Sequence, residues 1–270
     1  MPHITQLHVY PIKSLRGVAV SSWTVEKRGL KHDRRWMLVD ENGEFLTQRK
    51  LYRMALFDTV FEDGDIRVAV EGAGSILVPL EPQGPERTVK VWRSVCSALQ
   101  VSDAVDEWFS NALETPCSLV YMPDSTRRQV SSPEAKSGDL VGFADSNPVL
   151  VASEASLDLL NGKLDRAIPI TRFRPNIVVN GCGPHEEDEW ETISCAGVPM
   201  RRTHPCGRCL VTTIDIETAE PSDEPLRTLN AYRKRGNNVY FGCYYVPDAQ
   251  GEISVGGEMT VRHLAPVSSL

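Results

Sequence analysis

Short apolar segments separated by turn residues make up most of the first 95 positions. The segments are rich in Val, Ile, Leu, Tyr and Trp, and breaks such as Asn42-Gly43 lie between them. An Asn-Gly pair between two such segments is typical of an antiparallel hairpin. The clearest case predicts one strand over 35–40 and a second over 44–49.

From position 102 onward the apolar spacing becomes that of a helix. Val105, Phe109 and Leu113 recur at intervals of four residues, and Ser102 is suited to cap the helix N-terminus. The other predicted elements are a capped helix over 153–160, a helix bracketed by Pro225 and Gly236, and strands over 176–179, 198–202 and 210–216.

The segment 123–140 separates two units of the chain. It contains much Ser, Pro and charge and little apolar sequence, which is typical of a loop or linker. We therefore predict one domain over 1–122 and a second over 123–266. Strands outnumber helices, so the fold class is predicted to be mixed α+β and β-dominated, with a few helices. A barrel is favoured over a sandwich, because closing a sheet removes its exposed edges.

Composition and charge narrow the class of protein. The 270 residues are 41% apolar, and no apolar run approaches the ~20 residues that span a membrane. The first ten residues lack the features of a targeting peptide, so we expect a cytoplasmic protein without a membrane partner. The 29 basic and 36 acidic residues give a net charge of −7, which argues against nucleic acid as a partner.

The segment 172–176 reads Arg-Phe-Arg-Pro-Asn and is expected to be extended, because a residue before proline avoids helical geometry. Side chains alternate along a strand, so Arg172, Arg174 and Asn176 would share one face. Two guanidinium groups beside an amide suit a phosphate or a pterin-like ring. A solvated strand face with arginines paired to acids explains the same pattern, and spacing alone does not decide between them.

Seven cysteines in a chain without an export signal are expected to be reduced thiols. Two of them, Cys206 and Cys209, have CxxC spacing with Arg208 between them. The pair could be half of a zinc site, a redox pair, a single thiolate metal ligand beside Arg208, or two buried thiols at a turn. A zinc site lacks a second ligand pair, and a redox pair lacks its helix, whereas the last two interpretations stay open.

Two N-terminal clusters place cations at strand edges. Lys13 and Arg34 could neutralise a phosphate while Ser14 donates a hydrogen bond, although isolated basic residues at strand ends are usually solvated. His204 and Cys182 are candidates for a base and a second thiol at the same site, and a core or loop role fits each of them equally well.

Five short motifs follow one another along nearly the whole chain. They are Tyr10-Pro-Ile-Lys-Ser14, Asp33-Arg-Arg-Trp36, Thr47-Gln-Arg49, Arg172-Phe-Arg-Pro-Asn176 and Cys206-Gly-Arg-Cys209. In this order they resemble the MOSC-domain proteins that carry an N-terminal β-barrel domain, such as the mitochondrial amidoxime-reducing component and its bacterial relatives. The resemblance implies a MOSC β-barrel domain preceded by a barrel-like domain.

The same resemblance implies a molybdenum cofactor, in which molybdopterin holds the metal and one protein cysteine ligates it. The matching position is Cys209, the expected metal ligand and catalytic residue. The positions that match cofactor-binding residues are Lys13, Ser14, Arg34, Ser146, Asn147, Arg174, Asn176, Gly207 and Arg208. Asn147 departs from the pattern, since relatives tend to have a hydroxyl residue there.

The implied activity is the reduction of N-hydroxylated small molecules, such as hydroxylamines, amidoximes and N-hydroxylated bases, with a role in detoxification. Some bacterial relatives carry a 2Fe-2S domain whose cysteine cluster is missing here, so electrons are expected from a separate ferredoxin- or flavodoxin-type protein. A sulfur carrier that holds a persulfide, or a carrier of the molybdenum cofactor, stays open as an alternative. Some MOSC domains are fused to cysteine desulfurases that use pyridoxal phosphate.

Overall fold

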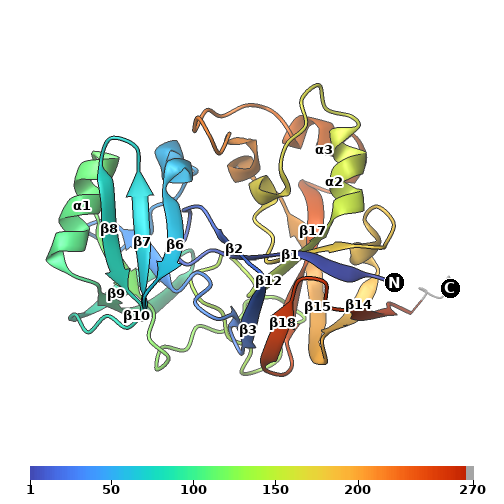
Figure 1. The fold of residues 1–270 in the computed structure, drawn as a ribbon, viewed down its shortest axis with the longest axis horizontal. Helices are drawn as coiled ribbons and strands as arrows, with labels where there is room; N and C mark the ends of the chain where they lie inside the picture. Colours follow the sequence, from blue (N-terminus) through green and yellow to red (C-terminus); the bar gives the residue numbers. More distant parts are fainter. Residues whose placement is uncertain (266–270) are drawn as a thin grey trace.

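Two lobes, each with its own sheets and apolar core, lie side by side (Figure 1). The N-terminal lobe contains β5 to β11 and α1, and the C-terminal lobe contains β1 to β4, β12 to β19, α2 and α3. The computed structural model describes residues 1–265. The predicted end of the second domain, at residue 266, lies outside the described residues.

Two small antiparallel sheets and one helix form the N-terminal lobe. In β7, Ile66, Val68 and Val70 are buried and alternate with partly exposed residues, so one face of the strand meets the core. The elements are β5 (Trp36–Val39), β11 (Ser118–Tyr121), β10 (Ser94–Gln100) and β9 (Glu86–Val91) in one sheet, β6 (Asp58–Glu62), β7 (Asp65–Val70) and β8 (Gly74–Pro79) in the other, the 3-10 helix η1 (Tyr52–Leu56), and α1 (Asp103–Leu113).

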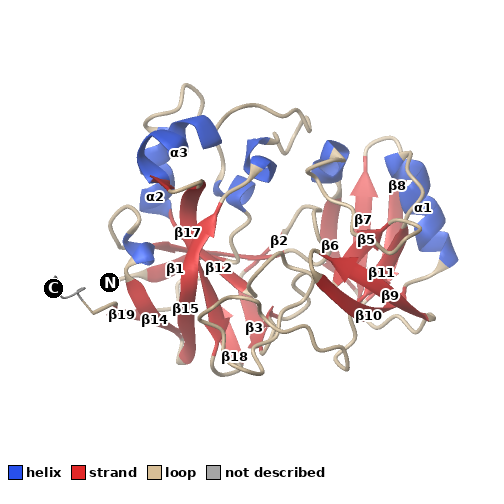
Figure 2. Cartoon of the chain, turned by 180° about the vertical axis from the view of Figure 1, so that it is seen from behind, coloured by secondary structure: helices blue, strands red, loops and turns tan. Residues whose placement is uncertain are grey.

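A strongly curved nine-stranded sheet dominates the C-terminal lobe, and the helices cover its outer side (Figure 2). Its strands in spatial order are β19 (Met259–His263), β14 (Trp190–Cys195), β15 (Val198–Gly207), β17 (Asn238–Pro247), β12 (Val149–Ser153), β13 (Ile177–Asn180), β1 (His3–Val9) and β2 (Val18–Val20), with β16 (Lys234–Arg235) beside β17. The remaining elements are the sheet β18 (Gly251–Ser254), β3 (Ser22–Glu26) and β4 (Gly29–Leu30), the helices α2 (Glu154–Asn161) and α3 (Leu226–Arg233), and the 3-10 helices η2 (Ile170–Phe173), η3 (Glu186–Asp188) and η4 (Leu210–Thr213).

The start of the chain belongs in space to the C-terminal lobe. Strand β1 pairs antiparallel with β13, and β3 pairs antiparallel with β18. The chain therefore passes from one lobe to the other after β4 and returns through the segment before β12. A division of the sequence near residue 122 stays a prediction, and the sheets show that the strands β1 to β4, within the first 30 residues, pair with strands of the second unit or with one another.

The mixed, β-dominated fold class is confirmed, with three α-helices among the described residues. All three helices were predicted, and Ser102 caps α1 by accepting a hydrogen bond from the Val105 amide at 3.2 Å. The predicted 35–49 hairpin is present only in part, because β5 contacts the following segment through an isolated bridge between Val39 and Phe45. The strand predicted over 210–216 is wrong, since η4 occupies its first half.

No helix within residues 1–265 has both the length and the apolar character needed to cross a bilayer.

Candidate functional site

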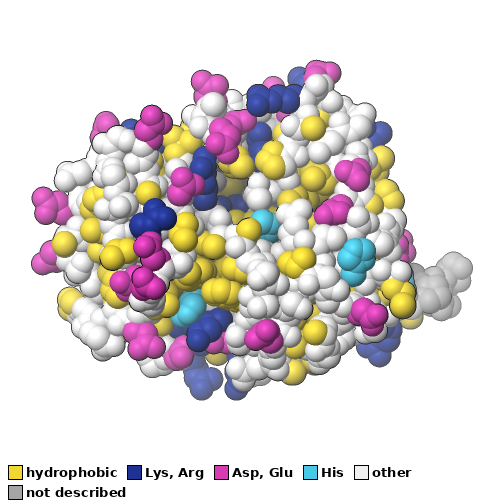
Figure 3. Space-filling view, in the orientation of Figure 1, with side chains coloured by type: hydrophobic (Ala, Val, Ile, Leu, Met, Phe, Trp, Pro, Cys, Tyr) yellow, Lys and Arg dark blue, Asp and Glu magenta, His cyan; other side chains and the backbone are white. Residues whose placement is uncertain are grey.

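A cavity of about 420 Å³ is lined by residues of both lobes. Figure 3 shows one face of the molecule, which is hollowed between the two lobes and has basic side chains at the edge of the hollow. All ten positions that the resemblance matches to metal- or cofactor-binding residues line the cavity, whereas the candidate thiol Cys182 does not. Lys13 and Ser14 follow β1, Arg34 lies between β4 and β5, Ser146 and Asn147 precede β12, Arg174 and Asn176 lie between η2 and β13, and Gly207, Arg208 and Cys209 lie at the end of β15. The structure thus brings these residues together, while their part in binding a cofactor stays a prediction.

Backbone hydrogen bonds between two N-terminal turns build one wall of the cavity. The Lys13 amide donates to the Trp36 carbonyl at 2.8 Å, and the Arg34 amide donates to the Tyr10 carbonyl at 2.7 Å. Ser14 and Arg34 both have positive φ, 69° and 47°, which turns the chain sharply at each position. The two motifs that carry the predicted phosphate contacts are therefore fixed against each other by the backbone.

Asp33 and Asn176 form a buried network behind this wall. One Asp33 oxygen accepts hydrogen bonds from the Tyr10 amide (2.8 Å) and from the Asn176 side chain (2.9 Å), and the other accepts from Arg34 (2.6 Å). The Asn176 oxygen accepts from Arg34 (3.1 Å) and from the Leu150 amide (3.1 Å). Both ends of the Asn176 amide are therefore engaged within the protein, and its observed role is to hold Arg34.

The guanidinium groups of Arg34 and Arg174 each lie 4.3 Å from the centre of the Tyr10 ring. Such contacts orient a cation over an aromatic face. Burial and the neighbouring Arg34 lower the pKa of Arg174 to about 10. Gly17 leaves room for this ring, since a Cβ there would come within 2.5 Å of a Tyr10 ring carbon.

Asp145 contacts three side chains that come from separate segments of the chain. Its carboxylate pairs with Lys13, accepts a hydrogen bond from Trp92 Nε1 at 3.0 Å and pairs with Arg49 at 2.8 Å. Although burial opposes ionisation, Lys13 and Arg49 hold the pKa of the Asp145 carboxyl well below its ordinary value. Asp145 therefore stays an anion and links the two lobes at the cavity.

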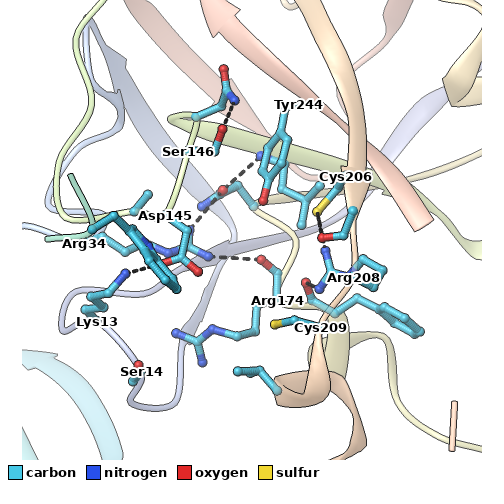
Figure 4. A pocket seen from close by; sticks show the side chains of 18 of the residues that line it. Lys13, Ser14, Arg34, Asp145, Ser146, Arg174, Cys206, Arg208, Cys209 and Tyr244 are labelled. Atoms are coloured by element: carbon cyan, nitrogen blue, oxygen red, sulfur yellow. Dashed lines mark hydrogen bonds and ion pairs between the residues drawn. The ribbon is translucent and has the colours of Figure 1, made fainter. Parts of the chain in front are cut away.

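The two thiols of the CxxC segment have different surroundings. Cys206 is buried, and its sulfur lies 2.7 Å from Arg208 Nη1. Cys209 is partly exposed in the cavity, and its sulfur accepts a hydrogen bond from Arg49 Nη2 at 3.2 Å. Figure 4 shows Cys206, Arg208 and Cys209 on one side of the cavity and Lys13, Ser14, Arg34 and Asp145 on the other.

All seven cysteines lie within the described residues and carry free thiols. No group of three or more His, Cys, Asp or Glu side chains in this part of the chain could hold a metal ion. Cys206 and Cys209 both line the cavity, where the Cys209 thiol is partly exposed and the Cys206 thiol is buried.

The predicted strand over 172–176 is wrong. Ile170–Phe173 forms the 3-10 helix η2, and Arg174 has φ 57° despite preceding Pro175. Arg172 points away from the cavity, where its Nε donates to the Thr212 carbonyl at 2.9 Å. Only Arg174 and Asn176 of the supposed shared face line the cavity.

Sequence reasoning missed several lining residues, among them Arg49, Trp92, Asp145 and Tyr244. Arg49 ends the Thr47-Gln-Arg49 motif, and Asp145 directly precedes the predicted Ser146, so sequence position was an available signal for both. Trp92 and Tyr244 carry no comparable signal. His204, one candidate base, does line the cavity, and burial lowers its pKa.

Comparison with known proteins shows the family of the chain. Residues 1–116 match the MOSC N-terminal beta barrel domain, and residues 139–260 match the MOSC domain. The chain is 33% identical to mitochondrial amidoxime-reducing component 1 of Mus musculus and 34% identical to that of Danio rerio, over 94% of this chain and 80% and 82% of those proteins. It is 28% identical to molybdenum cofactor sulfurase of Oryza sativa subsp. japonica, over 89% of this chain and 32% of that protein. The chain therefore belongs to the family of MOSC-domain proteins with a MOSC N-terminal β-barrel domain, to which the mitochondrial amidoxime-reducing components also belong.

Proposed function

We propose that this protein is a molybdenum-cofactor-dependent oxidoreductase that reduces N-hydroxylated compounds such as hydroxylamines, amidoximes and N-hydroxylated bases. The observation that carries the proposal is the accessible thiol of Cys209 in a cavity lined by five cationic side chains. The reaction class comes from relatives named amidoxime-reducing components, which are 33–34% identical over most of their length.

The lining of the cavity suits a large phosphorylated anion. Its cationic groups are Lys13, Arg34, Arg49, Arg174 and Arg208, whereas Asp145 is the one carboxylate among its described lining residues. The chain as a whole has a net charge of −7, so this excess of positive charge is local. The volume of about 420 Å³ falls within the ~300–1,000 Å³ common for cofactor sites.

Two arginines in the cavity have unused capacity for an anionic ligand. Arg174 forms no ion pair within residues 1–265, where its guanidinium donates to the Leu15 carbonyl at 2.7 Å and contacts Tyr10. The buried Nε of Arg208 has no hydrogen-bond partner among the described residues. Buried donors are nearly always satisfied, so these groups favour a ligand with several acceptor atoms, as molybdopterin has.

In this proposal, different residues hold different parts of the cofactor. Cys209 would ligate molybdenum through its thiolate, and a molybdenum–pterin group supplies the two-electron chemistry that cleaves an N–O bond. Lys13, Ser14 and Arg34, fixed together by the backbone, would hold the phosphate. Arg174 and Arg208 would offset the charge of the pterin dithiolene, with Ser146 and Asn147 at its edge.

Electrons come, in this proposal, from a separate ferredoxin- or flavodoxin-type protein.

Asn176 has a different role from the expected one in this proposal, because its fully engaged amide orients Arg34 and has no free donor or acceptor for the pterin. The tight attachment of Arg34 favours a rigid, preformed cofactor site.

The test uses protein from a host that makes molybdopterin. We expect stoichiometric molybdenum by elemental analysis, pterin fluorescence after oxidation, and reduction of benzamidoxime with reduced methyl viologen as the electron source. Cys209→Ala should lose the activity, and Cys96→Ala is the matched control, because Cys96 lies on β10 outside the cavity. A Cys209→Ala protein that keeps both molybdenum and activity would rule the proposal out.

A second candidate is a carrier that holds a persulfide on a cysteine of this segment. The similarity to molybdenum cofactor sulfurase and the accessible Cys209 thiol favour it. Intact-protein mass spectrometry separates the two functions. One added sulfur atom without bound pterin supports the carrier, whereas bound molybdopterin excludes a pure sulfur carrier.

A further inference from the structure

The hydrogen bond between Arg49 and Cys209 joins the two lobes directly beside the thiol. Arg49 lies between β5 and η1 in the N-terminal lobe, and Cys209 lies between β15 and η4 in the C-terminal lobe, 160 positions later in the chain. Arg49 Nη2 lies 3.2 Å from the Cys209 sulfur. Within residues 1–265, no other side chain donates a hydrogen bond to this sulfur.

Three contacts hold the Arg49 guanidinium in this position. The same Nη2 atom lies 2.8 Å from an Asp145 oxygen, Nη1 lies 3.3 Å from the Thr47 hydroxyl, and the guanidinium lies 5.0 Å from the centre of the Trp92 ring. Asp145 and Trp92 are themselves linked by a hydrogen bond of 3.0 Å. An arginine side chain has considerable rotamer freedom, and contacts on several sides remove it before any ligand arrives.

Arg53 belongs to the same segment of the chain but lacks such contacts. Its side chain is 46% exposed on η1, and its nearest carboxylate, on Glu114, lies 3.9 Å away. Pairs of this kind contribute little to stability. The positioning of Arg49 is therefore specific to the cavity.

We propose that Arg49 is a positioning residue for the metal-binding thiolate, held in place by Asp145, and that its hydrogen bond to the Cys209 sulfur raises the reduction potential of the metal. The inference rests on the proposed function, in which Cys209 ligates molybdenum. A hydrogen bond to a ligating sulfur withdraws electron density that the sulfur would otherwise donate to the metal, and such outer contacts tune metal potentials. A permanent positive charge near the sulfur acts in the same direction.

The experiment is an EPR-monitored redox titration of the cofactor-loaded protein, comparing the wild type with Arg49→Gln, Arg49→Lys and the control Arg53→Gln. We expect Arg49→Gln to shift the molybdenum midpoint potential to a lower value and to alter the Mo(V) signal. Arg49→Lys keeps the charge without the planar fork and should shift the potential less. Arg53→Gln should reproduce the wild type.

The outcomes separate this inference from the proposed function. Wild-type protein without bound molybdopterin overturns both. A loaded wild type whose potential and Mo(V) signal are unchanged in Arg49→Gln overturns the role of Arg49 alone. If neither Arg49 variant retains cofactor while Arg53→Gln does, Arg49 holds the cofactor in place, and tuning through the sulfur is contradicted.

Discussion

Asp33 and Asp145 both contact arginines that line the same cavity, yet their surroundings shift the pKa values of the two carboxyl groups in opposite directions. Burial raises the pKa of Asp33, although Arg34 partly offsets the effect, whereas Lys13 and Arg49 hold the pKa of Asp145 far down against burial. The Asp33 side chain is 1% exposed, and that of Asp145 is 37% exposed.

The difference follows from the partners of each carboxylate. Asp33 accepts hydrogen bonds from a backbone amide and a neutral side chain in addition to one arginine. Asp145 lies between two cations that come from separate segments. The buried, hydrogen-bonded network of Asp33 holds the surrounding segments in place. The more exposed ion pairs of Asp145 leave charged groups facing the cavity. We therefore expect Asp33 to matter most for folding and Asp145 for the electrostatics of the cavity.

Removing the Asp33 carboxylate should have the largest effect on stability. Asp33→Ala leaves the largely buried Arg34 without its ion-pair partner, which we expect to lower the free energy of unfolding by about 3 kcal/mol. Urea unfolding of the cofactor-free protein measures the change. A loss below about 1 kcal/mol would contradict a structural role for this network.

Asn176→Ala should have the second-largest effect on stability. The substitution removes the acceptor of the Leu150 amide and a donor to Asp33, both buried, and leaving such groups unsatisfied costs about 1–3 kcal/mol. The same unfolding measurement applies, and the loaded protein should also bind less cofactor because Arg34 loses one of its anchors. Unchanged stability with reduced cofactor binding would instead point to a direct contact with the pterin.

Asp145→Asn should change the pH dependence of the folding stability more than it changes the stability at neutral pH. Because the folded-state pKa of Asp145 lies below that of the unfolded chain, the unfolded chain binds more protons in acid. The contribution of Asp145 is therefore present above about pH 4 and is lost as the pH falls below it. Asp33 behaves in the opposite sense, since its raised pKa means that its ionisation disfavours the folded state.

Thermal unfolding between pH 3 and pH 7 tests this prediction. The wild type should lose stability towards pH 3 more steeply than Asp145→Asn does, because the variant lacks this ionisation. Lys13, Arg49, Trp92 and the nearby Arg128 remain in both proteins. Parallel curves for the two proteins would show that Asp145 has no depressed pKa.

Arg67→Ala should have the smallest effect and serves as the reference. Arg67 and Glu62 pair at 2.7 Å on the surface of the N-terminal lobe, with side chains 41% and 48% exposed. Exposed pairs contribute about 0–1 kcal/mol, so the change should lie near the limit of measurement. A loss comparable to that of Asp33→Ala would mean that burial does not distinguish the two networks.

Local signals were sufficient for the three helices and for the strands predicted over 35–40, 176–179 and 198–202, which correspond to β5, β13 and β15. Ser102 and Ser153 cap the helices that follow them. The two segments that were wrongly predicted to be strands, 172–176 and 210–216, pack on each other. Arg172 donates to the Thr212 carbonyl, and the Thr212 amide and hydroxyl both bond back to the Cys209 carbonyl, which favours short 3-10 turns over strands.

The amino-acid sequence specifies which chemical groups are present and, through five ordered motifs, indicates the family to which the chain belongs. It could not show that Arg49 reaches Cys209 across 160 positions, or that Lys13 meets Asp145 across 132. Those contacts depend on how the two lobes pack together. The folded structure shows in addition that Asn176 supports Arg34 and that Cys209 is the more exposed of the two thiols, because side-chain burial depends on neighbours that the local sequence does not specify.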